Sequence, residues 1–243
     1  MTALPHGRPC GQRALAAAAA LGPFFRVDER PGQGWTSWAA LIADGRALGR
    51  RAAEVRTLLA AGPGRPDVEP AVVASITHLG LVARLLSPLL GAALVGGVLP
   101  VTPVEYVHVG LAGANPLPLA LLPVSTAAAD SPERFATALD RFWLITAVQP
   151  LTLAVRASTP VSRQVLEGNV SSAVAGALRM AATARPELAR QADAVLDELL
   201  CSGPLAGAGR RRDDGSFVRR SCCLFYRLPG AGTCGDCVLG ERG

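Results

Sequence analysis

Apolar side chains recur every three to four positions along most of the chain, which is the spacing of one face of a helix. In residues 37–61 they alternate with arginines, and Gly62-Pro63-Gly64 ends this predicted helix. Residues 69–96 predict a longer and almost wholly apolar helix, with a kink at Pro88 and a stop at Gly96-Gly97. The first half of the chain is therefore expected to be mainly helical.

Further helices are predicted in the second half of the chain, where proline-containing start signals precede apolar runs. Ser131-Pro132-Glu133 combines a capping serine, a proline in the first turn and a carboxylate at the positive end of the helix dipole. The predicted helices cover 133–157, with a bend at Pro150, 162–184 and 186–200.

The pattern changes between residues 100 and 124. Alternating apolar positions from Val101 to His108, and the run 117–122, predict two short strands joined by a turn at 110–115. The expected fold class is thus mostly α (α+β). A helical domain, residues 1–205, contains this small β element, and residues 206–243 form a loop and a cysteine-rich tail docked on the helices.

Residues after Ser202 are rich in glycine, proline and charge. The segment 210–215 (RRRDDG) predicts a surface loop, and the cysteines follow it. A segment of this composition cannot build a core of its own, so we expect the helices to hold the tail in place.

Residues 85–104 are uncharged, and their length of twenty residues would span a membrane. Prolines and Gly96-Gly97 interrupt them, so the sequence predicts a buried helix followed by a turn and a strand. The alanine-rich residues 14–21 predict a short helix ended by Gly22-Pro23 rather than a signal peptide. We expect a cytoplasmic protein, with peripheral membrane association as the minor alternative.

Charge and composition exclude several functions. The formal charge is +5, and all 24 basic residues are arginine, so neither a Schiff-base lysine nor a lysine-containing phosphate loop exists. Aromatic residues make up only 5%, which provides no platform for stacking bases, and no nucleic-acid partner is expected. His78 lies in an apolar run and is interpreted as a hydrogen-bonded core histidine.

Four of the six cysteines form the pattern C-C-x10-C-x2-C near the C-terminus: Cys222, Cys223, Cys234 and Cys237. In a cytoplasmic protein such a cluster indicates metal binding or redox chemistry. Four thiolates suit an iron–sulfur cluster or zinc, and a redox dithiol or vicinal disulfide is the third alternative.

The segment between the two cysteine pairs is built to double back. It contains Pro229, Gly230 and Gly232, the residue types that tight turns require. We also expect Gly235 to keep the C-x2-C turn free of Cβ clashes.

Residues 219–227 (RRSCCLFYR) and 234–237 (CGDC) together resemble the C-terminal signature of the FhuF-like ferric siderophore reductases. A second, softer similarity is 168–173 (GNVSSA), which we expect to open a helix. The resemblance implies that Cys222, Cys223, Cys234 and Cys237 bind a 2Fe–2S cluster. Cys10 and Cys201 lie outside the pattern and are interpreted as ordinary buried thiols.

The resemblance also implies a function. Such a protein reduces ferric siderophores, hydroxamates by family, in the cytoplasm with electrons from a ferredoxin or another reductase partner. One electron is enough to loosen the metal, because oxygen donors hold Fe(III) far better than Fe(II). No catalytic residue beyond the cluster is expected. The alternative is a non-enzymatic zinc or iron–sulfur protein in which the metal fastens the tail and the helices bind a partner.

Residues beside the cysteines are expected to support them. Arg219, Arg220 and Arg227 would place positive charge where a siderophore or an acidic electron donor docks. Tyr226 is interpreted as a hydrogen-bond donor to sulfur or as a packing residue, with packing favoured. Asn169 is expected either to support the ligands or to cap a helix.

Overall fold

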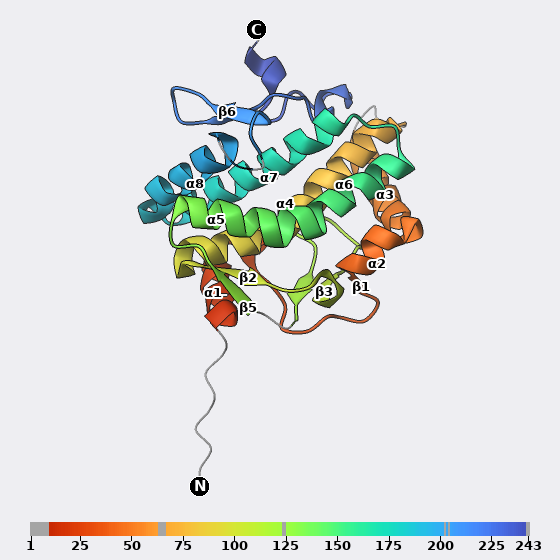
Figure 1. Cartoon of the computed structure of the whole chain (residues 1–243). Coiled ribbons are helices and arrows are strands. Elements are labelled where there is room, and N and C mark those ends of the chain that lie inside the picture. The colour runs from red at the N-terminus through yellow and green to blue at the C-terminus, as the bar shows by residue number, and fades with distance from the viewer. Residues whose placement is uncertain (1–9, 63–66, 123–124, 202, 204, 242–243) are drawn as a thin grey trace.

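The structure, a computed structural model, describes residues 10–62, 67–122, 125–201, 203 and 205–241. It is mostly α with small β elements, which confirms the predicted fold class (Figure 1). The α-helices are α1 (Cys10–Ala18), α2 (Trp38–Ala43), α3 (Gly45–Ala60), α4 (Pro70–Gly96), α5 (Pro132–Leu139), α6 (Gln149–Ser158), α7 (Arg163–Ala184) and α8 (Ala189–Cys201). The strands are β1 (Thr36–Ser37), β2 (Val98–Val101), β3 (Val107–Val109), β4 (Leu119–Leu121), β5 (Ser125–Ala128), β6 (Gly209–Arg211) and β7 (Phe217–Arg219).

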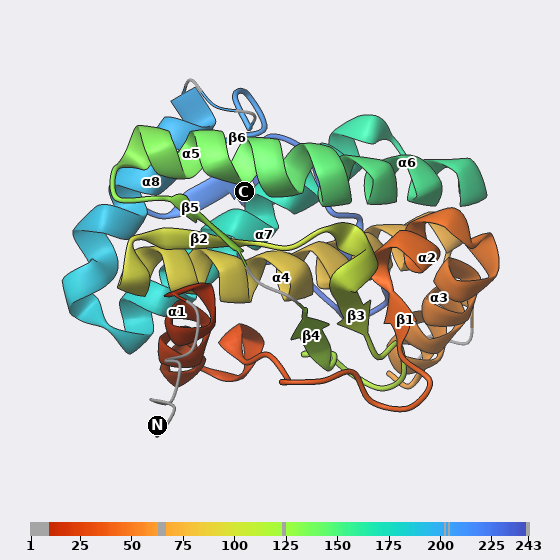
Figure 2. The same ribbon diagram turned by 60° about the horizontal axis from the view of Figure 1, so that its bottom comes forward.

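Helices α4 and α7 pack against each other at the centre of the molecule, where α4 is buried along most of its length (Figure 2). Gly97 ends α4 as predicted, with φ at 64°, a conformation that glycine adopts without strain. The long apolar run is thus a core helix. It is the helix in the described residues that is long and apolar enough to cross a membrane, and 72% of its most apolar window is buried inside the protein.

The predicted helix 133–157 is a rod with an irregular middle. Ser131 caps its start by accepting a hydrogen bond from the Arg134 amide at 3.3 Å, as predicted. The rod then passes through a nine-residue π-helix, Asp140–Val148, before α6 begins. Pro150 has no amide hydrogen, so regular helical bonding cannot run unbroken through it. The irregularity lies before the proline rather than at it.

The predicted hairpin between residues 100 and 124 is present. Strands β3 and β4 are antiparallel, with Val107 opposite Leu121, and β1 adds to β3. A second pair, β2 with β5, covers α1 and α4. The strand predicted after the turn at Gly96-Gly97 is β2, whereas the sequence missed β1 and β5 as separate strands. It also placed a strand at Val104–Tyr106, where the chain forms a 3-10 turn.

Two other expectations were wrong in detail. Residues 37–61 form two helices, because Asp44 interrupts the run and caps α3 by accepting from the Arg46 amide at 2.8 Å. The predicted loop 210–215 belongs to a hairpin of β6 and β7, turned at Gly215. Arg211 anchors this hairpin to α8 through Asp193 and Asp197, at 3.1 and 3.0 Å. Pro63-Gly64, and residues 1–9, 202, 204, 242 and 243 of the two expected domains, lie outside the described residues.

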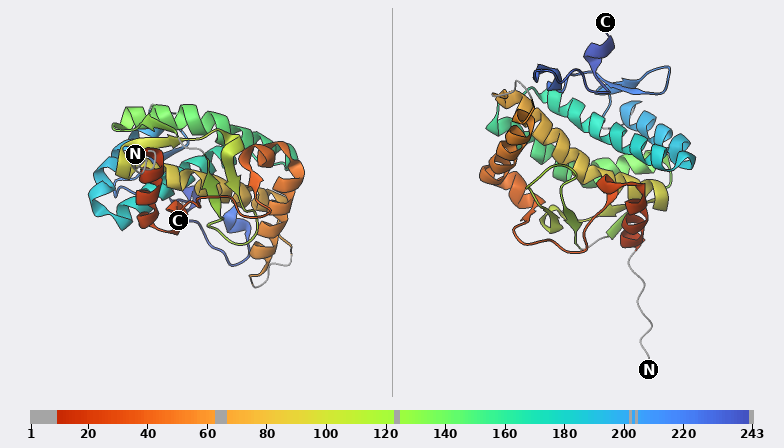
Figure 3. Two further views of the ribbon diagram at one scale, coloured as in Figure 1. Left: turned by 90° about the horizontal axis from the view of Figure 1, so that it is seen from below. Right: turned by 180° about the vertical axis from the view of Figure 1, so that it is seen from behind.

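The tail that follows α8 lies across α7, at the opposite end of the molecule from strands β1 to β5 (Figures 1 and 3). Leu228 buries its side chain in a small apolar cluster with Val55 of α3 and Val72 and Val73 of α4. The tail is therefore held by the helices, as its composition predicted.

Candidate metal centre

The four tail cysteines lie on two turns that face each other. Cys222 and Cys223 follow β7 after two intervening residues. The turns of Gly230 and Gly232, with φ at 69° and 67°, then bring the chain back. The second turn is closed by a hydrogen bond from the Cys237 amide to the Cys234 carbonyl, at 3.1 Å. A Cβ on Gly235 would meet no atom within 4 Å, so the expected need for glycine at this position is wrong.

One sulfur from each pair is in direct contact. Sγ of Cys223 and Sγ of Cys234 lie 3.4 Å apart. This is far longer than a disulfide bond of about 2.05 Å, and all six cysteines are free thiols. Two thiolates bound at about 2.3 Å to one tetrahedral metal would lie about 3.8 Å apart. The observed separation is therefore close to what a shared metal requires.

The other two sulfurs accept backbone hydrogen bonds. The Leu224 amide donates to Sγ of Cys222, and the Leu239 amide donates to Sγ of Cys237, both at 3.3 Å. Leu224 reaches this position in the left-handed region, with φ at 68°, which costs a non-glycine residue about 1–2 kcal/mol. Amide hydrogens aimed at sulfur stabilise the thiolate form, which is the form that binds metal.

The thiols influence each other's ionisation. Hydrogen bonding by Cys234 lowers the pKa of Cys223 to about 6, and the same shared proton raises the pKa of Cys234. The pKa of Cys222 is raised by burial first, and also by the nearby thiols of Cys223 and Cys237. Contact within the Cys223–Cys234 pair thus favours one thiolate and one thiol over two thiolates.

In type and number the four side chains suit a metal centre with sulfur ligands, and two of the sulfurs are already in contact. Within the described residues, however, no group of three or more Cys, His, Asp or Glu side chains is already closed around one point. The two turns present the ligands as one contacting pair, with the remaining two sulfurs flanking it.

Behind the cysteines, a chain of buried polar groups joins three separate elements. Nη2 of Arg219, on β7, donates to Oδ1 of Asn169, on α7, at 2.8 Å. Nδ2 of Asn169 donates to Oγ of Ser75, on α4, at 3.1 Å, and Oγ of Ser75 donates to the backbone carbonyl of Cys223 at 2.8 Å. These three side chains are each 1% exposed or less. We call Arg219, Asn169 and Ser75 the buried relay.

Close packing lets the tail reach this relay. A Cβ on Gly168 would collide with Oγ of Ser221 and lie 2.7 Å from Nη2 of Arg219. Ser221 also donates to the Gln164 carbonyl at 2.6 Å, and the Arg219 amide donates to the Asp236 carbonyl at 3.2 Å. The glycine–asparagine pair of the 168–173 segment therefore lies inside α7, where the tail packs against it. It neither opens nor caps the helix.

The three arginines near the cysteines differ. Arg219 is 1% exposed, so the expected docking role is wrong for this residue. Arg227 forms an ion pair with Glu69 at the start of α4, at 2.9 Å, while Arg220 is exposed. Tyr226 is 45% exposed and hydrogen-bonds to Arg227. It therefore does not pack the tail onto the helices, and no hydrogen bond joins it to a cysteine sulfur in the described part of the chain.

Sequence reasoning missed Ser75, and no local pattern marks it, because 148 positions separate it from Cys223. Cys10 and Cys201 are exposed, which corrects the expectation that they are buried. His78 is buried, and burial together with Arg219 lowers its pKa to about 3. Its Nε2 lies 3.0 Å from Oγ1 of Thr152, but Nδ1 has no partner in the described structure, so the predicted core histidine is only half satisfied.

Comparison with known proteins identifies the tail. Among curated proteins none matches the chain significantly. A family model, described as the FhuF 2Fe-2S C-terminal domain, matches residues 219–239, which include all four clustered cysteines. This match confirms the resemblance that the cysteine spacing predicted. The C-terminal segment of this chain is therefore similar to the FhuF 2Fe-2S C-terminal domain.

Proposed function

We propose that the protein is an oxidoreductase that reduces ferric siderophores of the hydroxamate type in the cytoplasm. The observation that carries the proposal is the match of residues 219–239 to a 2Fe-2S domain, on a segment whose four cysteines are free thiols, two of them with sulfurs 3.4 Å apart. The ferric chelate gains one electron and becomes ferrous. An external donor such as a reduced ferredoxin loses that electron.

Cys222, Cys223, Cys234 and Cys237 would hold the 2Fe–2S cluster. When bound, such a cluster supplies electrons one at a time, which matches the one-electron reduction of Fe(III). Oxygen-donor ligands release Fe(II) more readily than Fe(III), so no acid or base is needed to free the metal.

The rest of the chain would hold and tune these ligands. The buried relay fixes the carbonyl of Cys223, and the amides of Leu224 and Leu239 point at two of the sulfurs. Hydrogen bonds to sulfur and restricted solvent access are the features by which proteins set the potential of such a centre. Arg220, exposed beside the cysteines, is the arginine left to attract an acidic donor.

The experiment is a visible absorption spectrum of the freshly purified protein, with iron and zinc analysis. We expect charge-transfer bands that bleach with dithionite and return when a ferric hydroxamate siderophore is added. Cys234→Ser should lose the bands and the reoxidation, whereas Cys201→Ser, which removes an exposed thiol outside the tail, should keep both.

Two results would overturn the proposal. A colourless protein with one zinc and no iron would indicate a structural metal site. Full siderophore reductase activity in Cys234→Ser would show that the tail does not carry the reaction.

A further inference from the structure

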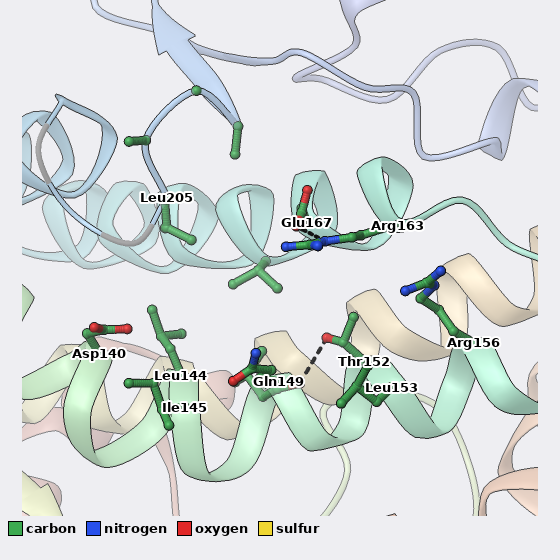
Figure 4. A pocket seen from close by; sticks show the side chains of 15 residues that line it. Asp140, Leu144, Ile145, Gln149, Thr152, Leu153, Arg156, Arg163, Glu167 and Leu205 are labelled. Atoms are coloured by element: carbon green, nitrogen blue, oxygen red, sulfur yellow. Dashed lines mark hydrogen bonds and ion pairs between the residues drawn. The ribbon is translucent and has the colours of Figure 1, made fainter.

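Beside the tail, a groove of about 560 Å³ separates the rod of α5, the π-helix and α6 from α7 (Figure 4). We call it the α6–α7 groove. Its floor is apolar, formed by Leu144 and Val148 of the π-helix, Val170 of α7 and Leu205. Its volume lies within the range of about 300–1,000 Å³ typical of ligand sites.

The groove adjoins the cysteines through the loop 205–208. The Arg220 amide donates to the Ala208 carbonyl at 2.9 Å, and a Cβ on Gly207 would lie 3.7 Å from Nη1 of Arg220. Arg220 therefore stands at the rim of the groove. Cys222 follows two residues later, which limits its Cα to about 7 Å from that of Arg220.

Charges line the groove in both signs. Arg163 and Glu167 of α7 form an ion pair at 2.6 Å, and Asp140 stands at the far end. Arg156 projects from α6 toward the α7 side, and it makes no hydrogen bond or ion pair within the described residues (Figure 4). The two arginines and two carboxylates of the lining cancel in formal charge, so of the residues named here only Arg220 at the rim adds a net positive charge. A triply negative ligand would therefore find little net attraction, while an uncharged ligand rich in carbonyl acceptors could use the free guanidinium.

Two features of the rod mark the groove as more than a gap between helices. The π-helix contributes Asp140, Leu144, Ile145 and Val148 to the lining, and π-helical segments are rare and often occur at functional sites. Ile145 on the π-helix and Leu153 on α6 are 53% and 56% exposed. Apolar side chains of this size at the edge of a concave site are suited to the organic shell of a ligand.

We propose that the α6–α7 groove binds the ferric chelate itself, as an uncharged complex, with Arg156 contacting a carbonyl oxygen of its organic shell. The inference rests on the proposed function for the identity of the ligand, but not for the position of the site.

The test uses gallium(III) complexes, which keep the charge of the ferric complex but are not reduced, so binding is measured without any redox reaction. Equilibrium dialysis of the full chain against an uncharged gallium trihydroxamate complex should show binding. Ala206→Trp, which fills the groove from the loop, should abolish it. Arg156→Ala should weaken it about tenfold, the effect of losing a charged hydrogen bond.

Arg179→Ala, an exposed arginine of α7 outside the groove, is the matched control and should bind as the unchanged protein does. Circular dichroism melting checks that Ala206→Trp still folds. A gallium tricatecholate complex of charge −3 should bind at least about tenfold more weakly than the uncharged complex.

Equal binding by Ala206→Trp, Arg156→Ala and the unchanged protein would overturn the site, as would no binding by the unchanged protein. Tighter binding of the tricatecholate would overturn the inference about charge. Failure of the two proposals can be told apart. If the ferric chelate reoxidises the reduced centre equally well in Ala206→Trp, the groove proposal fails and the reductase proposal stands. If the protein holds only zinc but still binds the gallium chelate, the groove proposal stands and the reductase proposal fails.

Discussion

The helical body of this protein and its cysteine tail are stabilised by different kinds of interaction. In the body, α4 and α7 bury aliphatic side chains against each other, and residues such as Leu85, Leu89 and Leu178 are almost fully enclosed. The tail buries far fewer apolar groups. It is fastened by directed polar bonds, above all those of the buried relay and Ser221. The comparison teaches that the body is stable by packing, whereas the geometry of the cysteines depends on a few hydrogen bonds.

The largest effect is expected in the body. Leu89→Ala, at a fully buried position of α4, should lower the free energy of unfolding by about 4 kcal/mol through lost burial and the cavity left behind. Thermal melting measures this loss. Iron content per folded molecule should stay unchanged, and a selective loss of iron would contradict the division between body and tail.

Arg219→Ala should instead weaken the docking of the tail and leave the helical body intact. It leaves Oδ1 of Asn169 and the Val165 carbonyl without their donor in a buried place, which costs the docked tail about 3 kcal/mol. Hydrogen exchange should become fast in residues 217–239, while amides of α4 keep their protection. Arg220→Ala, one position along and exposed, is the control and should leave exchange unaltered.

Acid should weaken the contact between α4 and its neighbours through His78. Its pKa is about 3 in the folded protein and about 6.5 when unfolded, so the unfolded chain binds more protons between these values. The stability that neutral His78 contributes is complete above pH 6.5 and is lost as the pH falls toward 3.

Between pH 6.5 and 4.5 this loss amounts to about 2 kcal/mol. His78→Gln should flatten the pH dependence of the free energy of unfolding over this range, and urea titrations at several pH values measure it. His108→Gln is the matched control. An unchanged slope in His78→Gln would show that another group titrates.

The smallest effect is expected where the tail meets the surface of α4. Arg227→Ala removes the ion pair with Glu69, in which both side chains are largely exposed. Such pairs contribute less than about 1 kcal/mol, and salt screens them. Melting temperatures of the variant and the unchanged protein should converge as salt is added. A larger loss of stability that persists in high salt would show that the Arg227–Glu69 pair anchors the tail more strongly than the buried relay does.

Much of the helical body could be predicted because its signals are local. Ser131 marks the start of α5 and Gly97 marks the end of α4. The apolar run of α4 predicts a helix without any information on the segments that pack against it. The four-cysteine pattern is local in the same sense, and the family match supports it. Asp44 shows the limit even here, because one capping side chain divides a run that otherwise reads as a single helix.

What the sequence could not reveal depends on residues that are far apart along the chain. Arg219 and Arg220 are adjacent and of one type, yet one is enclosed and the other exposed, because only Arg219 meets Asn169, which lies 50 positions earlier. The hairpin of β6 and β7 depends in the same way on Asp193 and Asp197 of α8, which hold Arg211. No periodicity within residues 206–220 encodes these partners.

The buried relay also bears on the order in which the protein matures. Ser75 and Asn169 precede Cys222 in the chain, so they leave the ribosome before it. The residues that receive Arg219 and the Cys223 carbonyl are thus synthesised before any of the four tail cysteines. A metal that reaches the tail after synthesis would then meet thiols whose positions these hydrogen bonds already restrict.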